Sequence, residues 1–292
     1  MTRESTPETG AIARGRDRPQ HMLGPYRLLR LLGKGGLGEV FEAQGPDGRT
    51  VAVKAFRLQD DEQGLAAGAF VREASLGQRL QHPDIVRVFD SGCHGDYAYL
   101  AMEFVPGHDL RVHTRRGELL PLPRLLHIAE RVARAVAAAH AINVIHRDLK
   151  PGNVLLDDAG DRVKVTDFGL ARLGDAFRSR TGIIAGTPGY MSPEQLAEVP
   201  LGPASDLYAL GVMLFELLTA RLPHEAHSLG ELLIKVTSRA APRLHTLRRD
   251  VPAALDRLVA RLLERRPEDR PASAAEVADE LAAIRAALTP AA

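Results

Sequence analysis

Charged and amide side chains gather in one short stretch of this chain, and they constrain its fold more than any other feature. Residues 146–153 read His-Arg-Asp-Leu-Lys-Pro-Gly-Asn, and Asp167 opens a later Asp-Phe-Gly triplet. Together the stretch and the triplet supply two carboxylates, Asp148 and Asp167, with the Asn153 amide and the Lys150 ammonium group. A chain of 292 residues is long enough for one large domain or for two lobes with a cleft between them.

Composition excludes several classes of protein. The formal net charge of +1 argues against a protein that coats nucleic acid or adsorbs strongly to membranes. A single cysteine, Cys93, excludes an internal disulfide framework and suits a reducing cytoplasm. No apolar run in the sequence is long enough to span a bilayer, and the first residues lack the apolar core of a signal peptide. We therefore expect a cytoplasmic location, either alone or as the cytoplasmic part of a longer membrane protein.

Hydrophobic patterning divides the chain near Phe104. Before that point we predict one helix at residues 65–80 and five strands; after it, the pattern is mostly helical, beginning with a helix at 122–142. Two short strands, at 154–156 and 163–166, are expected after the polar stretch, and capping-box spacings begin two later helices at Ser228 and Ser273. The five strands are predicted at residues 26–32, 39–43, 51–54, 85–90 and 97–104.

A glycine-rich segment follows the first predicted strand. Gly33, Gly35, Gly36, Gly38 and Val40 fit the pattern G-x-G-x-x-G-x-V, in which glycines let backbone N–H groups approach phosphate oxygens. The pattern alone is weak, because dinucleotide-binding folds use a similar one. In those folds a helix follows the glycines, whereas here we expect a strand.

Lys54 lies in the middle of a predicted strand, where a buried charge is unfavourable unless it is paired. Its expected partner is Glu73, on the helix that follows. The alternative is that Glu73 pairs with Arg72 or Arg79 on the surface.

Together these motifs resemble the protein kinase family over nearly the whole chain, from about residue 26 to 288. Lys150 and the later Gly186-Thr187 pair resemble Ser/Thr kinases rather than Tyr kinases, and the set is most similar to bacterial Hanks-type enzymes. The resemblance implies a two-lobed α+β fold. It places a small five-stranded antiparallel N-lobe with one main helix at residues 25–104 and a larger, mostly helical C-lobe at 105–288. Residues 1–24 are predicted to be a disordered tail, and 289–292 a tail or the start of a linker.

The resemblance also implies ATP- and Mg²⁺-dependent transfer of phosphate to Ser or Thr of proteins, including the chain itself. Asp148 would be the base, Lys150 would contact the transferred γ-phosphate, and the Lys54–Glu73 pair would position the other phosphates. Asn153 and Asp167 offer hard oxygen ligands suited to Mg²⁺, with Mn²⁺ as a substitute.

The same resemblance places the nucleotide base. Met102 would be the gatekeeper, the backbone of Glu103 and Val105 would bind adenine, and Asp109 would bind the ribose. The residues expected on the two faces of the ring are Val40, Ala52 and Leu155. An ordinary core strand explains residues 100–105 equally well, since only the position of the strand in the fold distinguishes a base-binding role from a packing role.

Three further residues are expected to be structural. Glu194 is predicted to form a buried salt bridge with Arg270, and Asp206 to anchor the backbone of the catalytic loop, the polar stretch at 146–153, from its helix. Ser192 stands where the family usually has Ala. His146 is expected to pack rather than act as a base.

Two regulatory hypotheses concern the activation segment and the predicted helix. Phosphate on Thr181 or Ser179 is expected to pair with Arg147 and order the segment; the alternative is that both are ordinary polar loop residues. Gly77 stands where the family usually has an apolar side chain, so the helix is expected to pack weakly. The alternative is that Gly77 only permits a close approach of backbones.

Rival functions differ in what they require. A catalytically weak pseudokinase that scaffolds partners would lack one of the key groups, yet Lys54, Asp148, Asn153 and Asp167 are all present. A small-molecule kinase would not need the Gly186-Thr187 segment. The expected partners are protein substrates and a second copy bound through the N-lobe, with no nucleic acid and no membrane span within the chain.

Overall fold

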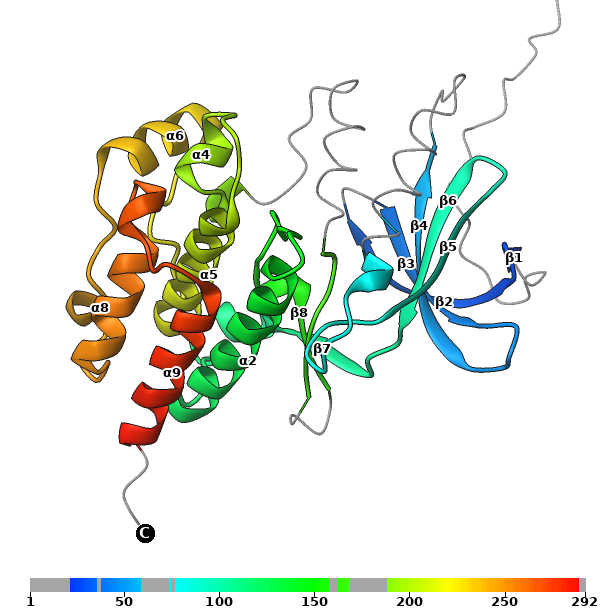
Figure 1. Cartoon of the computed structure of the whole chain (residues 1–292), viewed down its shortest axis with the longest axis horizontal. Helices are drawn as coiled ribbons and strands as arrows, with labels where there is room; N and C mark the ends of the chain where they lie inside the picture. The colour runs from blue at the N-terminus through cyan, green and yellow to red at the C-terminus, as the bar shows by residue number, and fades with distance from the viewer. Residues whose placement is uncertain are drawn as a thin grey trace, which may run out of the picture.

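The computed structural model shows two lobes, a β-sheet lobe and a helical lobe, joined end to end (Figure 1). Two buried hydrophobic clusters lie within the N-lobe, and the large cluster of the C-lobe also takes in Leu80 and Ile85 of the N-lobe. This arrangement confirms the predicted α+β fold with a sheet-rich N-lobe and a helical C-lobe. The structure describes residues 22–35, 38–58, 74, 77–157, 162–168 and 188–288.

The N-lobe is built on one antiparallel sheet with the order β1-β2-β3-β4-β6-β5. Its central strand β4 is buried along most of its length, because Val51, Val53 and Ala55 pack on one face. A turn at residues 45–48 joins β3 to β4, with Gly48 in the left-handed region at φ 80°. The strands are β1 (Met22–Leu23), β2 (Tyr26–Gly35), β3 (Gly38–Gln44), β4 (Thr50–Arg57), β5 (Val88–His94) and β6 (Tyr97–Glu103).

Three details of the N-lobe differ from the sequence prediction. The sheet has a sixth strand, since Met22–Leu23 pairs with the start of β2 inside the segment expected to be a tail. β5 begins at Val88 rather than at residue 85, because Ile85 instead forms an isolated parallel bridge to Val165 of the other lobe. Of the helix predicted at residues 65–80, only Ala74 and residues 77–80 lie within the described part, and Ala74 and 77–79 are helical.

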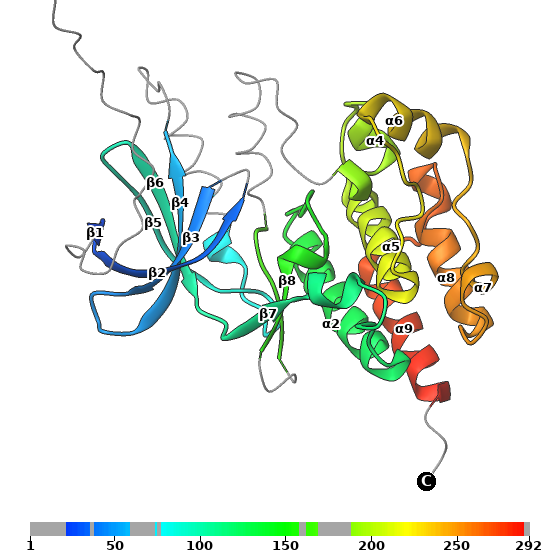
Figure 2. The same cartoon turned by 180° about the vertical axis from the view of Figure 1, so that it is seen from behind.

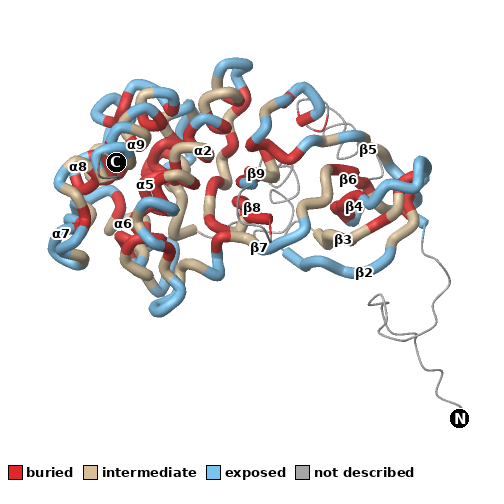
Figure 3. Tube along the Cα trace, turned by 90° about the horizontal axis from the view of Figure 1, so that it is seen from below, coloured by how far each residue is buried: buried red, intermediate tan, exposed pale blue. Residues whose placement is uncertain are grey.

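Helix α5 (Pro203–Thr219) forms the centre of the C-lobe, and nearly all of its residues are buried (Figure 3). Helices α2 (Leu122–His140) and α9 (Ala274–Leu288) lie side by side, and α8 (Ala253–Leu262) packs on α5 (Figures 1 and 2). The predicted helix at 122–142 is thus confirmed to within two residues of its end. The remaining helices of the described C-lobe are α4 (Pro193–Leu196), α6 (Leu229–Ser238) and α7 (Leu244–Leu247), with short 3-10 turns η1 (Leu110–Thr114), η2 (Pro151–Asn153), η3 (Pro188–Tyr190) and η4 (Pro267–Asp269).

A small sheet, β7-β8-β9, lies where the lobes meet. Its strands β7 (Gly107–Asp109), β8 (Val154–Asp157) and β9 (Val163–Val165) include both short strands predicted after the polar stretch. Ser228 and Ser273 accept hydrogen bonds from Glu231 N and Glu276 N, as their spacings predicted. In the part of the chain that the structure describes, no helix is both long and apolar enough to cross a membrane.

Candidate active site

An apolar cluster lines one end of the junction between the lobes. Ala52 and Met102 face each other across β4 and β6, and both are buried together with Val86. Residues from three more segments pack against them, including Leu155 of β8 in the other lobe. The structure thus brings together the residues predicted to hold a flat base: Val40, Ala52, Met102, Val105 and Leu155.

Glu103 ends β6 and links the two lobes. Its N–H donates to Arg87 O at 2.8 Å, and its carboxylate accepts from Lys164 Nζ at 2.7 Å and from Arg162 Nη2 at 2.8 Å. Lys164 also donates to Ile85 O at 3.3 Å. Sequence reasoning missed Lys164, although a lysine between two valines of a buried strand signals a paired charge.

The glycine-rich segment forms the end of the β2–β3 hairpin. Gly33 and Gly35 lie in β2, and Gly38 opens β3 opposite Gly35. Gly38 has φ 142°, and a Cβ there would lie 2.1 Å from Ala55 O, so no other residue fits. Gly36 lies outside the described residues.

Lys54 is buried, at 7% exposure, and its ammonium group finds a partner across the junction. Its Nζ donates to Asp167 Oδ2 at 2.7 Å. Asp167 has φ 67°, in the left-handed region that few residues other than glycine adopt. Glu73, the predicted partner of Lys54, lies outside the described residues.

Asp148, Lys150 and Asn153 form one hydrogen-bonded cluster. Lys150 Nζ lies 2.7 Å from Asp148 Oδ2 and 3.0 Å from Oδ1. Asn153 Nδ2 donates to Asp148 O at 2.7 Å and to Asp148 Oδ2 at 3.2 Å. Because its nitrogen is used in this way, Asn153 retains its side-chain oxygen as a ligand for a cation. The Thr166 N–H donates to Asn153 O at 2.9 Å, which holds the segment before Asp167 beside this cluster.

Asp206 anchors the catalytic-loop backbone from helix α5, as predicted. Its two carboxylate oxygens accept from His146 N and Arg147 N, both at 2.8 Å. His140 Nε2 lies 2.8 Å from the same carboxylate, a contact that sequence reasoning missed because nothing near His140 marks it. These bonds satisfy a buried charge and hold Arg147 at φ 68°.

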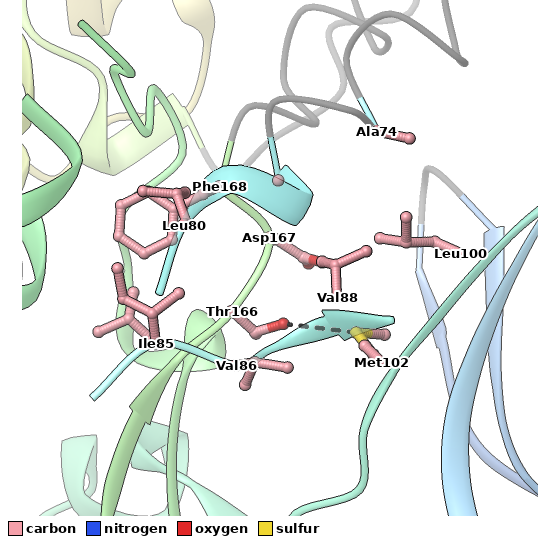
Figure 4. A pocket seen from close by; sticks show the side chains of 12 residues that line it. Ala74, Leu80, Ile85, Val86, Val88, Leu100, Met102, Thr166, Asp167 and Phe168 are labelled. Atoms are coloured by element: carbon pink, nitrogen blue, oxygen red, sulfur yellow. Dashed lines mark hydrogen bonds between the residues drawn. The ribbon is translucent and has the colours of Figure 1, made fainter. Parts of the chain in front are cut away.

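Phe168 packs against His146, with ring centroids 4.6 Å apart. His146 Nε2 lies 3.0 Å from Thr166 O, which fits the predicted packing role. Beside Phe168 lies a cavity of about 20 Å³, bordered also by Gly77, Val88, Met102 and Asp167 (Figure 4). Among the described residues, a Cβ on Gly77 would meet Val88 Cγ2 alone, at 3.4 Å.

The predicted salt bridge between Glu194 and Arg270 is confirmed. It is bidentate, at 2.7 and 2.9 Å, and both side chains are buried. Burial raises the pKa of Glu194, but hydrogen bonds from Arg270 and Ser205 outweigh it and hold the pKa below its usual value. Ser192, at the unusual position, caps α4 in a capping box with Gln195.

Tyr190 and Glu216 form a further pair, half-buried, that sequence reasoning did not find. The Tyr190 hydroxyl donates to a Glu216 carboxylate oxygen. Burial raises the pKa of both groups, and the bond from Tyr190 only partly offsets this for Glu216.

Asp109, expected at the ribose, lies at the end of β7 and caps η1. Its carboxylate accepts from Arg111 N at 2.9 Å and from the Arg111 guanidinium at 2.7 and 2.8 Å. Ser179 and Thr181 lie outside the described residues, so the switch that they were predicted to form stays a prediction.

Comparison with known proteins identifies relatives of this arrangement. A model of the protein kinase domain matches residues 26–281. The chain is 40% identical to serine/threonine-protein kinase pkn3 of Myxococcus xanthus over 273 residues, which cover 89% of this chain and 50% of that protein. It is 39% identical to PknH of Mycobacterium tuberculosis over 260 residues, covering 88% of this chain and 41% of that one. The chain thus spans half or less of the length of these relatives.

The family model covers most of the chain, and the relatives are similar along nearly all of it. The chain therefore belongs to the protein kinase family and carries the catalytic domain of the bacterial serine/threonine kinases.

Proposed function

We propose that this chain transfers the γ-phosphate of ATP to serine and threonine hydroxyls of proteins, including its own. One observation carries the proposal: the Lys54–Asp167 pair and the Asp148–Lys150–Asn153 cluster converge at one junction. The lobes that form it are proposed to be residues 25–104, with β1 added, and 105–288.

The apolar cluster and the charged groups would bind different parts of ATP. Ala52, Met102 and Leu155 offer flat apolar surface for adenine. The Glu103 N–H is already bonded to Arg87 O, so its carbonyl, together with Val105, is the group proposed to bind the base edge. Gly33, Gly35, Gly36 and Gly38 would cover the phosphates, and Lys54 would contact them. Asp109 would reach the ribose by exchanging its bond to Arg111.

The residues present fit a Mg²⁺ ion. Asn153 keeps an amide oxygen free of its own hydrogen bonds to Asp148, and Asp167 supplies a carboxylate nearby. Mg²⁺ binds through one or two such oxygens plus phosphate oxygens and water. When bound, it would neutralise charge on the phosphates.

Asp148 would orient the substrate hydroxyl and accept its proton late in the reaction. Its contact with Lys150 keeps an ammonium group at the point where the transferred phosphoryl group would arrive. Catalysis of this kind depends mainly on position and electrostatics, which the anchored loop provides.

Replacing Asp148 tests the proposal. Loss of a general base typically lowers a rate by about 10²–10⁴-fold, and we expect Asp148→Asn to lose peptide phosphorylation to that extent while ATP still binds. Asp250→Asn, an exposed aspartate of the C-lobe, is the matched control and is expected to keep full activity. Unchanged turnover in Asp148→Asn would contradict the assignment.

Asp167→Asn separates the metal role from the base role. We expect weaker Mg²⁺ binding and a lower rate, partly rescued by raising the Mg²⁺ concentration, because one oxygen ligand is weakened rather than the base removed. Rescue of Asp148→Asn by the same treatment would instead argue against distinct roles.

Autophosphorylation is proposed at Thr181 or Ser179, where phosphate would add about −1.5 to −2 charges able to pair with Arg147. Mass spectrometry of dephosphorylated protein, before and after incubation with ATP and Mg²⁺, tests this. Phosphate on neither residue would overturn the switch. A homodimer through the N-lobe is proposed as the arrangement for phosphorylation in trans.

A further inference from the structure

Two histidines meet beside the lobe junction, outside the groups used above. His108 lies in β7 and His113 in η1, and their Nε2 atoms are 3.4 Å apart. The ring centroids are 5.5 Å apart with an interplanar angle of 63°. We propose that His108 and His113 form a binding site for a divalent transition-metal ion of the Zn²⁺, Ni²⁺ and Cu²⁺ class.

The separation of the two nitrogens supports a metal better than a hydrogen bond. Two imidazole nitrogens bound at ~2.0–2.1 Å to a tetrahedral ion lie ~3.3–3.4 Å apart. A hydrogen bond involving nitrogen is usually shorter, about 2.9–3.0 Å. The observed 3.4 Å therefore matches the edge of a tetrahedral site and makes a poor direct bond.

The other nitrogen of His113 sets the required tautomer. Its Nδ1 lies 2.8 Å from Glu118 O, and because a carbonyl can only accept, Nδ1 carries the proton. The Nε2 of neutral His113 then presents its lone pair toward His108. A histidine that donates one nitrogen to a carbonyl while the other binds metal is the usual arrangement around protein-bound metals.

The backbone segments that carry the two rings are ordered before any ion binds. His108 is in register with Leu156 in the β7–β8 ladder, and Asp109 caps η1 through Arg111 N. The Thr114 hydroxyl donates to Arg111 O at 3.0 Å, which closes the same turn. The ion would thus join β7 to η1 at little ordering cost.

Ligand chemistry separates this site from the Mg²⁺ site. Imidazole favours Zn²⁺, Cu²⁺ and Ni²⁺, whereas Mg²⁺ favours oxygen. The adjacent Asp109 carboxylate is engaged by the Arg111 guanidinium, so two imidazoles and water would complete the coordination. The proposal does not depend on the function proposed above, because it needs neither nucleotide nor catalysis.

Isothermal titration calorimetry of the chelator-treated chain with ZnCl₂, in the presence of excess Mg²⁺, tests the site. His108→Gln and His113→Gln each remove one ligand, and each is expected to weaken Zn²⁺ binding by about tenfold or more. His227→Gln replaces an exposed histidine of the helical lobe and is expected to bind as the unmodified chain does. Circular dichroism checks that the variants are folded.

A second measurement uses stability. Zn²⁺ or Ni²⁺ is expected to raise the Tm of the unmodified chain and of His227→Gln, because an ion that binds only the folded state stabilises it. The rise is expected to shrink in both site variants. Absence of Zn²⁺ binding by the unmodified chain would overturn the proposal, and so would a Zn²⁺ affinity of His108→Gln or His113→Gln equal to that of the unmodified chain. Either result would leave the pair as a long hydrogen bond.

Discussion

The two sides of the candidate active site are supported in different ways. On the C-lobe side, the catalytic loop rests on the buried carboxylate of Asp206, and Glu194 is paired with Arg270 beside it. On the N-lobe side, Phe168 borders a cavity at Gly77. The first side is held by satisfied, directional bonds, and the second by apolar packing with a void.

This difference indicates which side can move. Buried hydrogen-bonded networks have one good geometry, because leaving any member unpaired is unfavourable. A void next to Phe168 removes packing contacts that would otherwise favour one position of the helical segment at 77–79. We infer that Asp148 and Lys150 keep a fixed position, and that the Gly77 side adjusts.

Removing the Arg270 side chain is expected to have the largest effect on stability. Breaking a buried ion pair at one partner typically costs about 3–5 kcal/mol, and we expect Arg270→Met to lower the free energy of unfolding by that amount. Arg261→Met is the control, since Arg261 forms half-exposed ion pairs with Glu276 and Glu280, a class worth less than about 1 kcal/mol each. Urea denaturation of both variants decides the point, and equal losses would refute a special role for the buried pair.

Asp206→Asn tests whether the catalytic loop depends on the carboxylate that anchors its backbone. The amide can accept only one of the two backbone N–H bonds well, and an unsatisfied buried donor costs about 1–3 kcal/mol. We expect a loss of stability of that size together with a lower initial rate of peptide phosphorylation, because the catalytic loop shifts. The exposed Asp250→Asn serves again as control. A variant with full activity despite lower stability would show that the loop does not depend on Asp206.

Acid is expected to weaken the helical lobe through Asp256. Burial raises its pKa, but hydrogen bonds from Arg243 and His245 dominate and lower it from 3.8 to about 2. A lowered pKa in the folded state adds stability above the unfolded pKa, and this stability is lost as the pH falls from 3.8 toward 2. The amount is about 2 kcal/mol.

Denaturation of the unmodified chain and of Asp256→Asn at several pH values measures this. At pH 6 the unmodified chain is expected to have a larger free energy of unfolding than Asp256→Asn. This difference is expected to close as the solution is acidified below pH 4. A gap that stays constant with pH would show that Asp256 contributes through packing alone.

Gly77→Ala is expected to have the smallest effect and the most informative one. A helical Ala is favoured over Gly by about 1 kcal/mol. Its methyl group fits the described surroundings, in which the nearest atom is Val88 Cγ2 at 3.4 Å. We expect higher stability and a higher initial rate for dephosphorylated protein at low concentration, since the cavity beside Phe168 shrinks.

Gly230→Ala in α6 is the matched control, because a Cβ there meets nothing within 4 Å. The same preference for Ala in a helix is expected to raise its stability, but the rate is expected to stay unchanged. If Gly77→Ala lowers the rate or leaves it unchanged while the fold is intact, the glycine serves close backbone approach and the hypothesis of weak packing fails.

The two lobes and the chemistry of the site could be predicted from the sequence. Asp148, Lys150 and Asn153 lie within one short loop, so their proximity needs little tertiary information. The strand that carries Lys54 was predicted from its alternating pattern, and Glu194–Arg270 and Asp206 were expected from their motifs. These features depend on residue type and local order, which a sequence states directly.

Tertiary structure decided the remaining features of the site, because they depend on contacts between distant segments. Lys54 reaches Asp167 across 113 positions, Lys164 pairs with Glu103, and His140 reaches Asp206. The cavity at Gly77 exists only because Val88, Met102 and Phe168 surround it. Even His108 and His113, close in sequence, meet only because β7 pairs with β8 and η1 turns back. Which charges pair, and where space is left, is determined by packing in three dimensions and not by residue type.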